Sequence, residues 1–183
     1  TNKIAEGELM QLANKNNLNT SLQQLKKISY YKTGRLFEAS AKSAAMLSGK
    51  SIPFIENISK AAKLIGIAFQ VRDDLLDYGV SKGNIGKPEM QDILEDKITY
   101  PLYFALKYSN KKDSSKILKK LKNKDFSIKE VADFVSSSNA FNKCNSLIQN
   151  YSNEISKCIN KISNKEIRDE MLNLSESLKN RYE

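Results

Sequence analysis

An apolar helical pattern that runs directly into three carboxylates constrains this chain more than any other feature of its sequence. Before the carboxylates, apolar residues recur at three- and four-residue steps, which is the period of a helix, at Ile58, Ala61, Ala62, Ile65 and Phe69. If the helix continues, Asp73 and Asp77 share a face about one turn apart, and Asp74 borders that face. The sequence therefore predicts a helix over residues 58–71 that leads into an acidic C-terminal end.

Three carboxylates in this position are electrostatically unfavourable by themselves. Like charges three or four residues apart on a helix repel each other, and the C-terminal end of a helix is the negative end of its dipole. A divalent cation would reverse this balance, because Mg²⁺ takes oxygen ligands and is usually held by one or two carboxylates together with substrate phosphates. The alternative is a solvated acidic helix end, which is the more common case for an isolated motif. The surrounding sequence has to decide between the two.

The surrounding sequence is basic. A loop rich in Gly, Asn and Pro, residues 83–88, follows the carboxylates and contains Lys87, and Lys97 lies ten residues further on. Upstream, Lys32 precedes Gly34, which interrupts an otherwise helical pattern. Ammonium groups near a carboxylate-bound metal suit a diphosphate, because they neutralise the anionic charge that the metal leaves. The pattern therefore favours a metal and diphosphate site.

Four motifs occur in order along the first part of the chain. They are Gly7-Glu8-Leu9-Met10-Gln11, Lys32-Thr33-Gly34-Arg35-Leu36-Phe37, Phe69-Gln70 through Asp77, and the lysine segments Gly86-Lys87 and Lys97-Ile98-Thr99-Tyr100-Pro101. In this order they resemble the Gly-Glu-x-x-Gln segment, the Lys-Thr-Ala-x-Leu-Phe segment, the second aspartate-rich motif and the closing lysines of the trans-isoprenyl diphosphate synthases, the polyprenyl synthetase family. The resemblance covers residues 7 to about 106 and concerns the C-terminal portion of a synthase of the octaprenyl or a related type.

The resemblance implies an all-α fold, the C-terminal part of the helical bundle of isoprenoid synthases. We expect residues 1–183 to form a single all-α domain, with the second aspartate-rich motif region in residues 1–108 and C-terminal helices in residues 111–183. The composition agrees with helices joined by short polar turns, because the chain contains only three prolines and seven glycines. Capping-box spacing at Ser127 and again at Ser163 predicts two helix starts.

The resemblance also implies roles for individual residues. The implied cofactor is Mg²⁺, which the aspartates of the motif would hold, with Asp73 as the direct ligand beside Asp74 and Asp77. Three lysines are implied to contact the diphosphate of the allylic substrate, namely Lys32, Lys87 and Lys97.

The implied reaction is the condensation of an allylic diphosphate with isopentenyl diphosphate. Diphosphate leaves the allylic substrate, the double bond of isopentenyl diphosphate attacks the cation, and a proton is lost to the departing diphosphate. Thr33 and Gln70 match polar residues beside the reacting carbons, and with Lys32 they form the implied catalytic set. The lone pairs of Thr33 and Gln70 would stabilise the developing allylic cation. Phe69 matches a residue near the homoallylic substrate.

Three positions depart from the family pattern. Met90 and Asp96 stand where small residues, commonly glycine, are usual, and Gly34 stands where alanine is usual. Because glycine adopts backbone conformations that other residues avoid, these departures lead us to expect altered loop geometry around Lys87 and Lys97.

Motifs that precede this region in a complete synthase are missing between Thr1 and Glu8. They are a first aspartate-rich motif, a following arginine pair, and a Gly-Lys-x-x-Arg-type segment for isopentenyl diphosphate. Because two metal clusters must face one diphosphate, we expect the chain to be a fragment or a processed C-terminal piece that is inactive in condensation when isolated. The resemblance implies a homodimer for the full-length protein.

Three other functions stay open. A non-catalytic homologous subunit would not require the aspartates and lysines together, and a terpene cyclase would typically use Asn, Ser and Glu in its second metal motif. A nucleic-acid-binding helical protein is suggested by the net charge of +9, but only four of the thirty basic residues are arginines, and the lysines lack interleaved aromatic residues. We therefore expect no nucleic-acid partner.

The sequence also bears on the compartment. It contains no run of the roughly 18 to 20 apolar residues that a membrane span needs, and no signal peptide opens it. We expect a cytoplasmic protein without stable membrane insertion.

Overall fold

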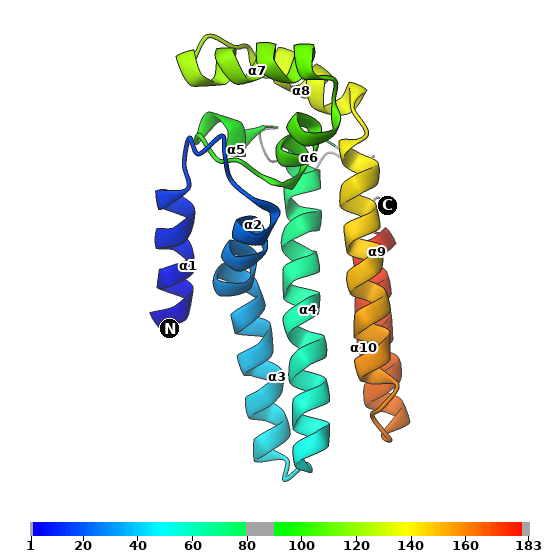
Figure 1. Cartoon of the computed structure of the whole chain (residues 1–183). Helices are drawn as coiled ribbons and strands as arrows, with labels where there is room; N and C mark the ends of the chain where they lie inside the picture. The colour runs from blue at the N-terminus through cyan, green and yellow to red at the C-terminus, as the bar shows by residue number, and fades with distance from the viewer. Residues whose placement is uncertain (1, 80–89, 181–183) are drawn as a thin grey trace.

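Helices make up the regular structure of the described residues (Figure 1). The computed structural model describes residues 2–79 and 90–180. In chain order the elements are α1 (Asn2–Ala13), α2 (Leu22–Ser29), the π-helical turn η1 (Tyr30–Gly34), α3 (Arg35–Leu47), α4 (Ile52–Asp77), α5 (Gln91–Leu94), α6 (Tyr100–Tyr108), α7 (Lys111–Asn123), α8 (Ile128–Ser137), α9 (Ala140–Ile159) and α10 (Lys165–Asn180). The expected all-α fold is confirmed.

The helices α3, α4, α9 and α10 run side by side along the length of the molecule, and α7 and α8 lie across one end of them (Figure 1). The helix α4 is the centre of this bundle. It is 26 residues long and contains the predicted helix of residues 58–71. Pro53 lies in its first turn, where a missing N–H group costs nothing. Ala61 and Ala68 of α4 are almost fully buried against Ile155 of α9, and their small side chains let the two helices approach closely.

A second cluster closes the bundle at the acidic end of α4. Fully buried residues of α4, α6, α8 and α9 meet there, namely Leu75, Leu102, Val131, Val135 and Ile148. The amphipathic helix α7 covers this cluster with Ile117 and Leu121. The last turns of α4 are therefore held within the core, next to the start of α6.

Arg72 joins this end of α4 to α10. Its side chain is only 1% exposed, and its Nε donates a hydrogen bond of 2.8 Å to the carbonyl oxygen of Leu178. A buried guanidinium has to be satisfied by acceptors, and here a carbonyl in the last turn of a helix, which has no intrahelical partner, contributes one. The residue before Asp73 thus ties α4 to α10.

Two close backbone contacts hold α1, η1 and α4 together, and each requires a glycine. A Cβ atom on Gly7 of α1 would lie 2.5 Å from the backbone nitrogen of Lys32, and one on Gly66 of α4 would lie 2.7 Å from the Cα atom of Gly34. The interruption predicted at Gly34 is therefore a π-helical turn packed against α4. Alanine at position 34 would be tight, because its Cβ would lie 3.1 Å from the carbonyl oxygen of Lys63.

The two loop positions that depart from the family pattern both have left-handed backbone conformations. Met90 has a φ of 63° and Asp96 a φ of 60°, which glycine adopts readily. For other residues this conformation costs about 1–2 kcal/mol. Met90 and Asp96 therefore introduce backbone strain on either side of α5.

One predicted helix start is confirmed and the other is wrong by one residue. The Ser127 side chain accepts a hydrogen bond from the backbone N–H of Glu130 and caps α8. For α10 the capping side chain is Asn164, which accepts from the N–H of Ile167, and not Ser163. Asparagine caps helices as well as serine does, so neighbouring capping residues compete for the same start.

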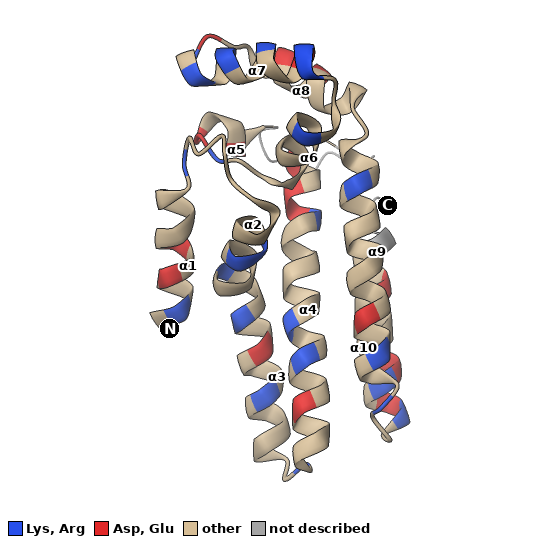
Figure 2. Cartoon of the chain, viewed as in Figure 1, with Lys and Arg blue, Asp and Glu red and all other residues tan. Residues whose placement is uncertain are grey.

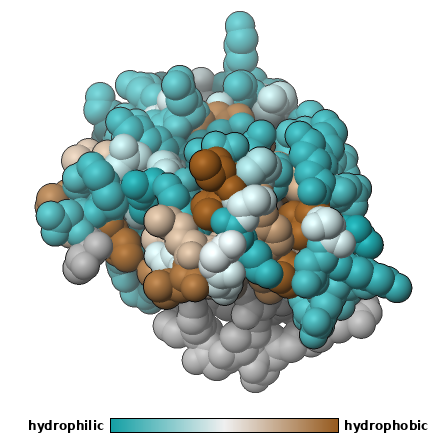
Figure 3. Space-filling view, turned by 90° about the horizontal axis from the view of Figure 1, so that it is seen from below, coloured by the Kyte–Doolittle hydropathy of each residue, from teal (hydrophilic) through white to brown (hydrophobic). Residues whose placement is uncertain are grey.

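Charged residues of both signs are spread over the helices, and the lysines are densest on α7 (Figure 2). At the end of the molecule formed by the turn between α3 and α4, apolar side chains interrupt the polar surface (Figure 3). Met46, Leu47 and Ile52 are exposed there, Leu47 by 90%. Among the described residues, no helix combines the length and the apolar character needed to cross a membrane.

Candidate functional site

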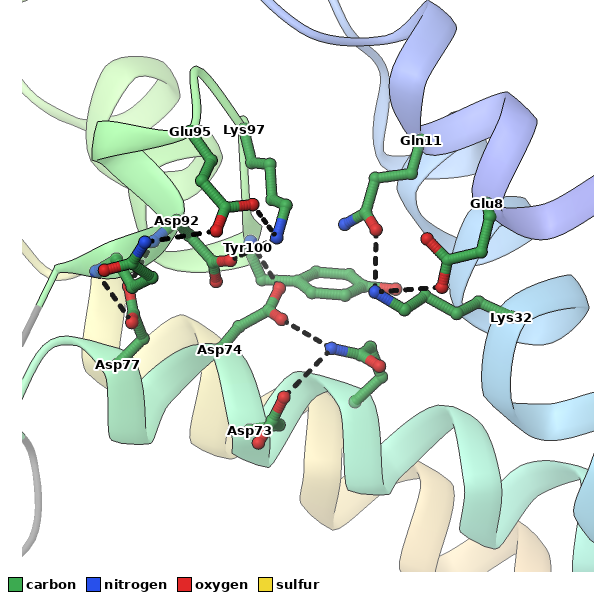
Figure 4. Close-up of polar contacts among 12 residues, drawn as sticks. Glu8, Gln11, Lys32, Asp73, Asp74, Asp77, Asp92, Glu95, Lys97 and Tyr100 are labelled. Atoms are coloured by element: carbon green, nitrogen blue, oxygen red, sulfur yellow. Dashed lines mark hydrogen bonds and ion pairs between the residues drawn. The ribbon is translucent and has the colours of Figure 1, made fainter. Parts of the chain in front are cut away.

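Segments that lie far apart in the sequence meet in a pocket beside the end of α4. The pocket is lined by residues of α1, α2, η1, α4 and the segment that leads into α6. Four of the predicted site residues line it, namely Lys32, Gln70, Asp74 and Lys97. In Figure 4, Lys32 and Lys97 approach the ring of Tyr100 from different sides, with Asp74 below it. The structure thus brings together residues that are up to 65 positions apart in the sequence.

The side-chain amide of Gln70 links the predicted catalytic and acidic residues. Its Oε1 accepts a hydrogen bond of 2.9 Å from the hydroxyl of Thr33. Its Nε2 donates to Oδ1 of Asp74 at 2.9 Å and, with a longer bond of 3.4 Å, to Oδ2 of Asp73. These partners fix the orientation of the amide, so Thr33 and Gln70 present a rigid polar pair next to the carboxylates.

Asp74 is the most buried of the three carboxylates. Its side chain is 6% exposed, and its Oδ2 accepts a hydrogen bond of 3.2 Å from the backbone N–H of Tyr100, at the start of α6. Burial, followed by the charge of Asp92, raises the pKa of Asp74 to about 8. This carboxylate is therefore part of the interior and connects α4 to α6.

Asp77 makes a similar contact with α5. Its Oδ1 accepts from the backbone N–H of Gln91 at 3.0 Å, and its Oδ2 from that of Asp92 at 3.2 Å. Burial raises the pKa of Asp77 to about 6, and the charge of Asp92 adds to the shift. The third aspartate of the motif thus caps a short helix.

Asp73 is the carboxylate of this motif that could hold a hard cation. Asp73 is half-buried, and carboxylate oxygens are the ligands that Mg²⁺ prefers. Within residues 2–79 and 90–180, no three His, Cys, Asp or Glu side chains converge as a metal-binding group. A Mg²⁺ ion that is shared with substrate phosphates needs only one or two protein carboxylates.

Lys97 is held by acidic side chains of its own segment. Its Nζ lies 2.8 Å from Oε2 of Glu95 and 3.2 Å from Oδ1 of Asp92. Partial burial lowers the pKa of Lys97, but the two carboxylates outweigh this effect and the net shift is upward. The ammonium group is therefore charged and stands at the edge of the pocket.

Lys32 has its partners on α1. Its Nζ donates to Oε1 of Gln11 at 2.7 Å and lies 3.5 Å from Oε1 of Glu8. The close contact at Gly7 places this face of α1 against η1. Sequence reasoning did not assign Glu8 and Gln11 to the site, although the Gly-Glu-x-x-Gln spacing that contains them was the available signal.

Two further predictions, for Lys87 and Phe69, stay predictions. Lys87 lies outside the described residues. Phe69 lies against Phe37 of α3, with ring centroids 6.1 Å apart, and both pack on the cluster between α4, α9 and α10. Asp92 and Glu95, which hold Lys97, were not predicted as site residues because nothing in their local sequence indicates their partner.

The fold is that of prenyl synthases of known structure. The chain superposes on the polyprenyl synthase from Caulobacter crescentus CB15, solved in complex with calcium and isoprenyl diphosphate, with a TM-score of 0.90 and 25% identity over 100% of this chain and 56% of that one. It superposes on the decaprenyl diphosphate synthase from Rhodobacter capsulatus with a TM-score of 0.87 and 24% identity, over 99% of this chain and 57% of that one.

Sequence comparison identifies the family. Residues 1–138 match the family model described as polyprenyl synthetase. The octaprenyl diphosphate synthase of Haemophilus influenzae is 36% identical over 117 residues, which cover 64% of this chain and 36% of that protein. The chain belongs to the polyprenyl synthetase family. It spans about a third of the length of this curated relative and little more than half of the solved structures.

Proposed function

We propose that this chain forms the part of a prenyltransferase that binds the allylic diphosphate during Mg²⁺-dependent chain elongation with isopentenyl diphosphate. The observation that carries the proposal is the convergence of Lys32, Gln70, Asp74 and Lys97 on one pocket. Two cationic groups, a fixed amide and an acidic helix end are the elements that binding and ionising a diphosphate require. Family membership supports the same reaction class.

The proposed metal site centres on Asp73, with Asp74 and Asp77 completing the acidic motif. When bound, Mg²⁺ would neutralise diphosphate oxygens and so favour their departure from the allylic carbon. Lys32 and Lys97 lie close enough to the pocket to contact the same diphosphate, and the sequence adds Lys87 to them. A diphosphate would compete with Glu8 for Lys32 and with Glu95 for Lys97.

Thr33 and Gln70, the polar pair beside the acidic end of α4, fit the next step, which is the formation of the allylic cation. The Thr33 hydroxyl donates a hydrogen bond to Oε1 of Gln70, so the lone pairs of the Thr33 oxygen are directed away from that bond. They stabilise positive charge that develops on the allylic carbon when the carbon–oxygen bond breaks. The double bond of isopentenyl diphosphate then attacks the cation, and the proton that is lost goes to the departing diphosphate. This chemistry needs no protein nucleophile, and the chain contains no histidine.

The homodimer implied by the resemblance and the cytoplasmic location expected from the sequence belong to the same proposal. The second candidate is a non-catalytic homologous subunit, which family membership alone would allow. The combination of lysines and aspartates around one pocket favours the diphosphate-binding function, because a structural subunit has no use for it.

The test is Mg²⁺-dependent binding of a non-hydrolysable allylic thiodiphosphate, measured by titration calorimetry on the 183-residue chain. Asp73→Ala should weaken binding about tenfold or more, since a charge-assisted ligand is lost. Asp133→Ala, on the exposed face of α8, is the matched control and should bind like the unmodified chain. Equal binding by the Asp73→Ala variant would reject Asp73 as a ligand, and failure of the unmodified chain to bind would reject the proposed function.

A further inference from the structure

We infer that Asp74 and Asp77 act in this site as positioning residues, which cap the starts of α6 and α5 and so fix the segment that carries Lys97. This inference rests on the proposed function, and it leaves direct metal ligation to Asp73. Two observations support this inference. Both carboxylates accept hydrogen bonds from backbone N–H groups, and the N-cap residues of α5 and α6 make no side-chain capping bond.

The start of α6 is capped from α4. The N-cap residue of α6, Thr99, makes no side-chain capping hydrogen bond. Asp74 of α4 accepts instead from the N–H of Tyr100, the first residue of α6. The first N–H groups of a helix have no intrahelical acceptor, and Tyr100 is buried, so an acceptor from elsewhere is required. Asp74 provides it across 26 positions of sequence.

The start of α5 is capped in the same way. Its N-cap residue, Met90, has no oxygen in its side chain and makes no capping bond. Asp77 accepts from the N–H groups of Gln91 and Asp92, and the backbone carbonyl of Asp77 accepts from the N–H of Met90 at 2.8 Å. The last turn of α4 therefore performs the capping function that the local sequence lacks.

These two contacts define where Lys97 lies. Asp74 and Asp77 are three residues apart on α4, and their partners Tyr100 and Gln91 bound the segment that carries Lys97. Both ends of this segment are thus attached to the last turn of α4. The position of the Lys97 ammonium group at the edge of the pocket depends on both attachments. Lys97 lies six residues after Gln91 and three residues before Tyr100.

The same contacts disfavour direct metal binding by Asp74 and Asp77. Backbone N–H groups at helix starts carry partial positive charge, and they already point at these carboxylates. A cation on the same oxygens would lie next to those donors. Backbone donors at the starts of α5 and α6 offset part of the cost of placing two of the three carboxylates at this end of α4.

Asparagine and alanine variants separate capping from ligation. Asparagine keeps one of the two capping oxygens of aspartate but lacks the negative charge that favours Mg²⁺ binding, whereas alanine has neither. The probe is inorganic pyrophosphate, titrated with Mg²⁺ and in EDTA. Asp77→Ala should weaken binding in EDTA about threefold to tenfold, as a misplaced Lys97 would, and Asp77→Asn should restore most of that loss. Asp73→Asn should lose only the part of the pyrophosphate affinity that depends on Mg²⁺.

Hydrogen exchange provides a readout that does not depend on ligand. Exchange of the Gln91 amide should be about tenfold faster in Asp77→Ala than in Asp77→Asn, because asparagine keeps one acceptor oxygen and alanine keeps none. The inference is overturned if the two variants exchange alike, or if Asp77→Asn loses the Mg²⁺-dependent binding as completely as Asp73→Asn does. If the unmodified chain binds no pyrophosphate, the proposed function fails, and the exchange measurement still decides whether Asp77 caps α5.

Discussion

The hydroxyl groups of Ser29 and Tyr100 lie 3.0 Å apart, and both residues are buried in the lining of the pocket. This contact joins the end of α2 to the start of α6. Tyr100 thereby has a partner at each end, since its N–H donates to Asp74. The pocket is consequently enclosed by side chains that also fix the relative positions of α2, α4 and α6.

We expect Tyr100→Phe to lower the free energy of unfolding by about 1 kcal/mol, because the buried Ser29 hydroxyl then loses one of its two hydrogen bonds and keeps only that to the carbonyl oxygen of Leu25. Ser29→Ala should cost a similar amount. The double variant should cost less than the sum of the two, which urea denaturation of all four proteins measures. Strict additivity would show that the two hydroxyls do not interact.

Gly7→Ala should displace α1 from η1, because the new Cβ would meet the backbone of Lys32 at 2.5 Å. We expect a loss of about 1–3 kcal/mol in unfolding free energy and weaker pyrophosphate binding, as Gln11 and Glu8 no longer hold Lys32. Ala5→Gly, on the exposed face of the same helix, is the control. It should lose only about 0.5–1 kcal/mol of helix propensity and should keep pyrophosphate affinity.

The strain at position 96 should be measurable by comparing two substitutions. Both Asp96→Gly and Asp96→Ala remove the ion pair of Asp96 with Lys124, but only glycine relieves the left-handed backbone. The glycine variant should therefore be about 1 kcal/mol more stable than the alanine variant. Equal stability would contradict the strained conformation. Met90→Gly should destabilise the protein despite the same relief, since Met90 is buried in the core.

In metal-free buffer the protein should become less stable as the pH rises from about 5 to 8. The pKa of Asp74 in the folded protein is about 8, far above its unfolded value near 4, so the folded state keeps a proton that the unfolded chain releases. Stability is then greatest at low pH and is lost as the pH rises towards the folded pKa, by at most about 1.4 kcal/mol per pH unit for one proton. Asp77, with a pKa of about 6, contributes in the lower part of this range.

Urea denaturation at several pH values measures this dependence. Asp74→Asn should flatten the slope between about pH 6 and 8, because the titrating group is removed. Asp133→Asn, an exposed substitution on α8, should leave the slope unchanged. The same slope in all three proteins would mean that another group accounts for it.

Glu95→Gln should raise the affinity for pyrophosphate in EDTA about twofold to fivefold. Glu95 pairs with Lys97 at 2.8 Å but is itself well exposed, and exposed ion pairs are weak. Removing its charge leaves Asp92 as the carboxylate beside Lys97 and makes the ammonium group more available to the anion. Glu154→Gln, which breaks an exposed ion pair with Lys157 on α9, is the matched control and should have no effect on pyrophosphate binding.

The local features of this fold were predictable from the sequence. The helix through Ile65 and the cap at Ser127 were predicted because their signals lie within a few residues of one another. The segments that contribute Lys32, Gln70 and Lys97 were predicted through the resemblance of their motifs, and the structure brings them together.

The long-range contacts were not predictable. Nothing near Asp74 indicates that the N–H of Tyr100 needs its carboxylate, and nothing near Lys32 shows that Gln11 lies beside it. The local sequence at the end of α4 shows only the charges of that helix. The starts of α5 and α6, which the fold brings against the carboxylates, lie 14 to 26 residues further along the chain.

The π-helical turn at η1 has a consequence for tolerance to changes in chain length. Its neighbouring residues face different helices, since Lys32 contacts α1 and Thr33 contacts α4. A π turn contains one residue more than an α turn. Deleting a single residue between Tyr30 and Gly34 would rotate the preceding helix by about 100° relative to α3. Lengthening or shortening the chain at this junction should therefore be far more damaging than the same change in the exposed turn between α3 and α4.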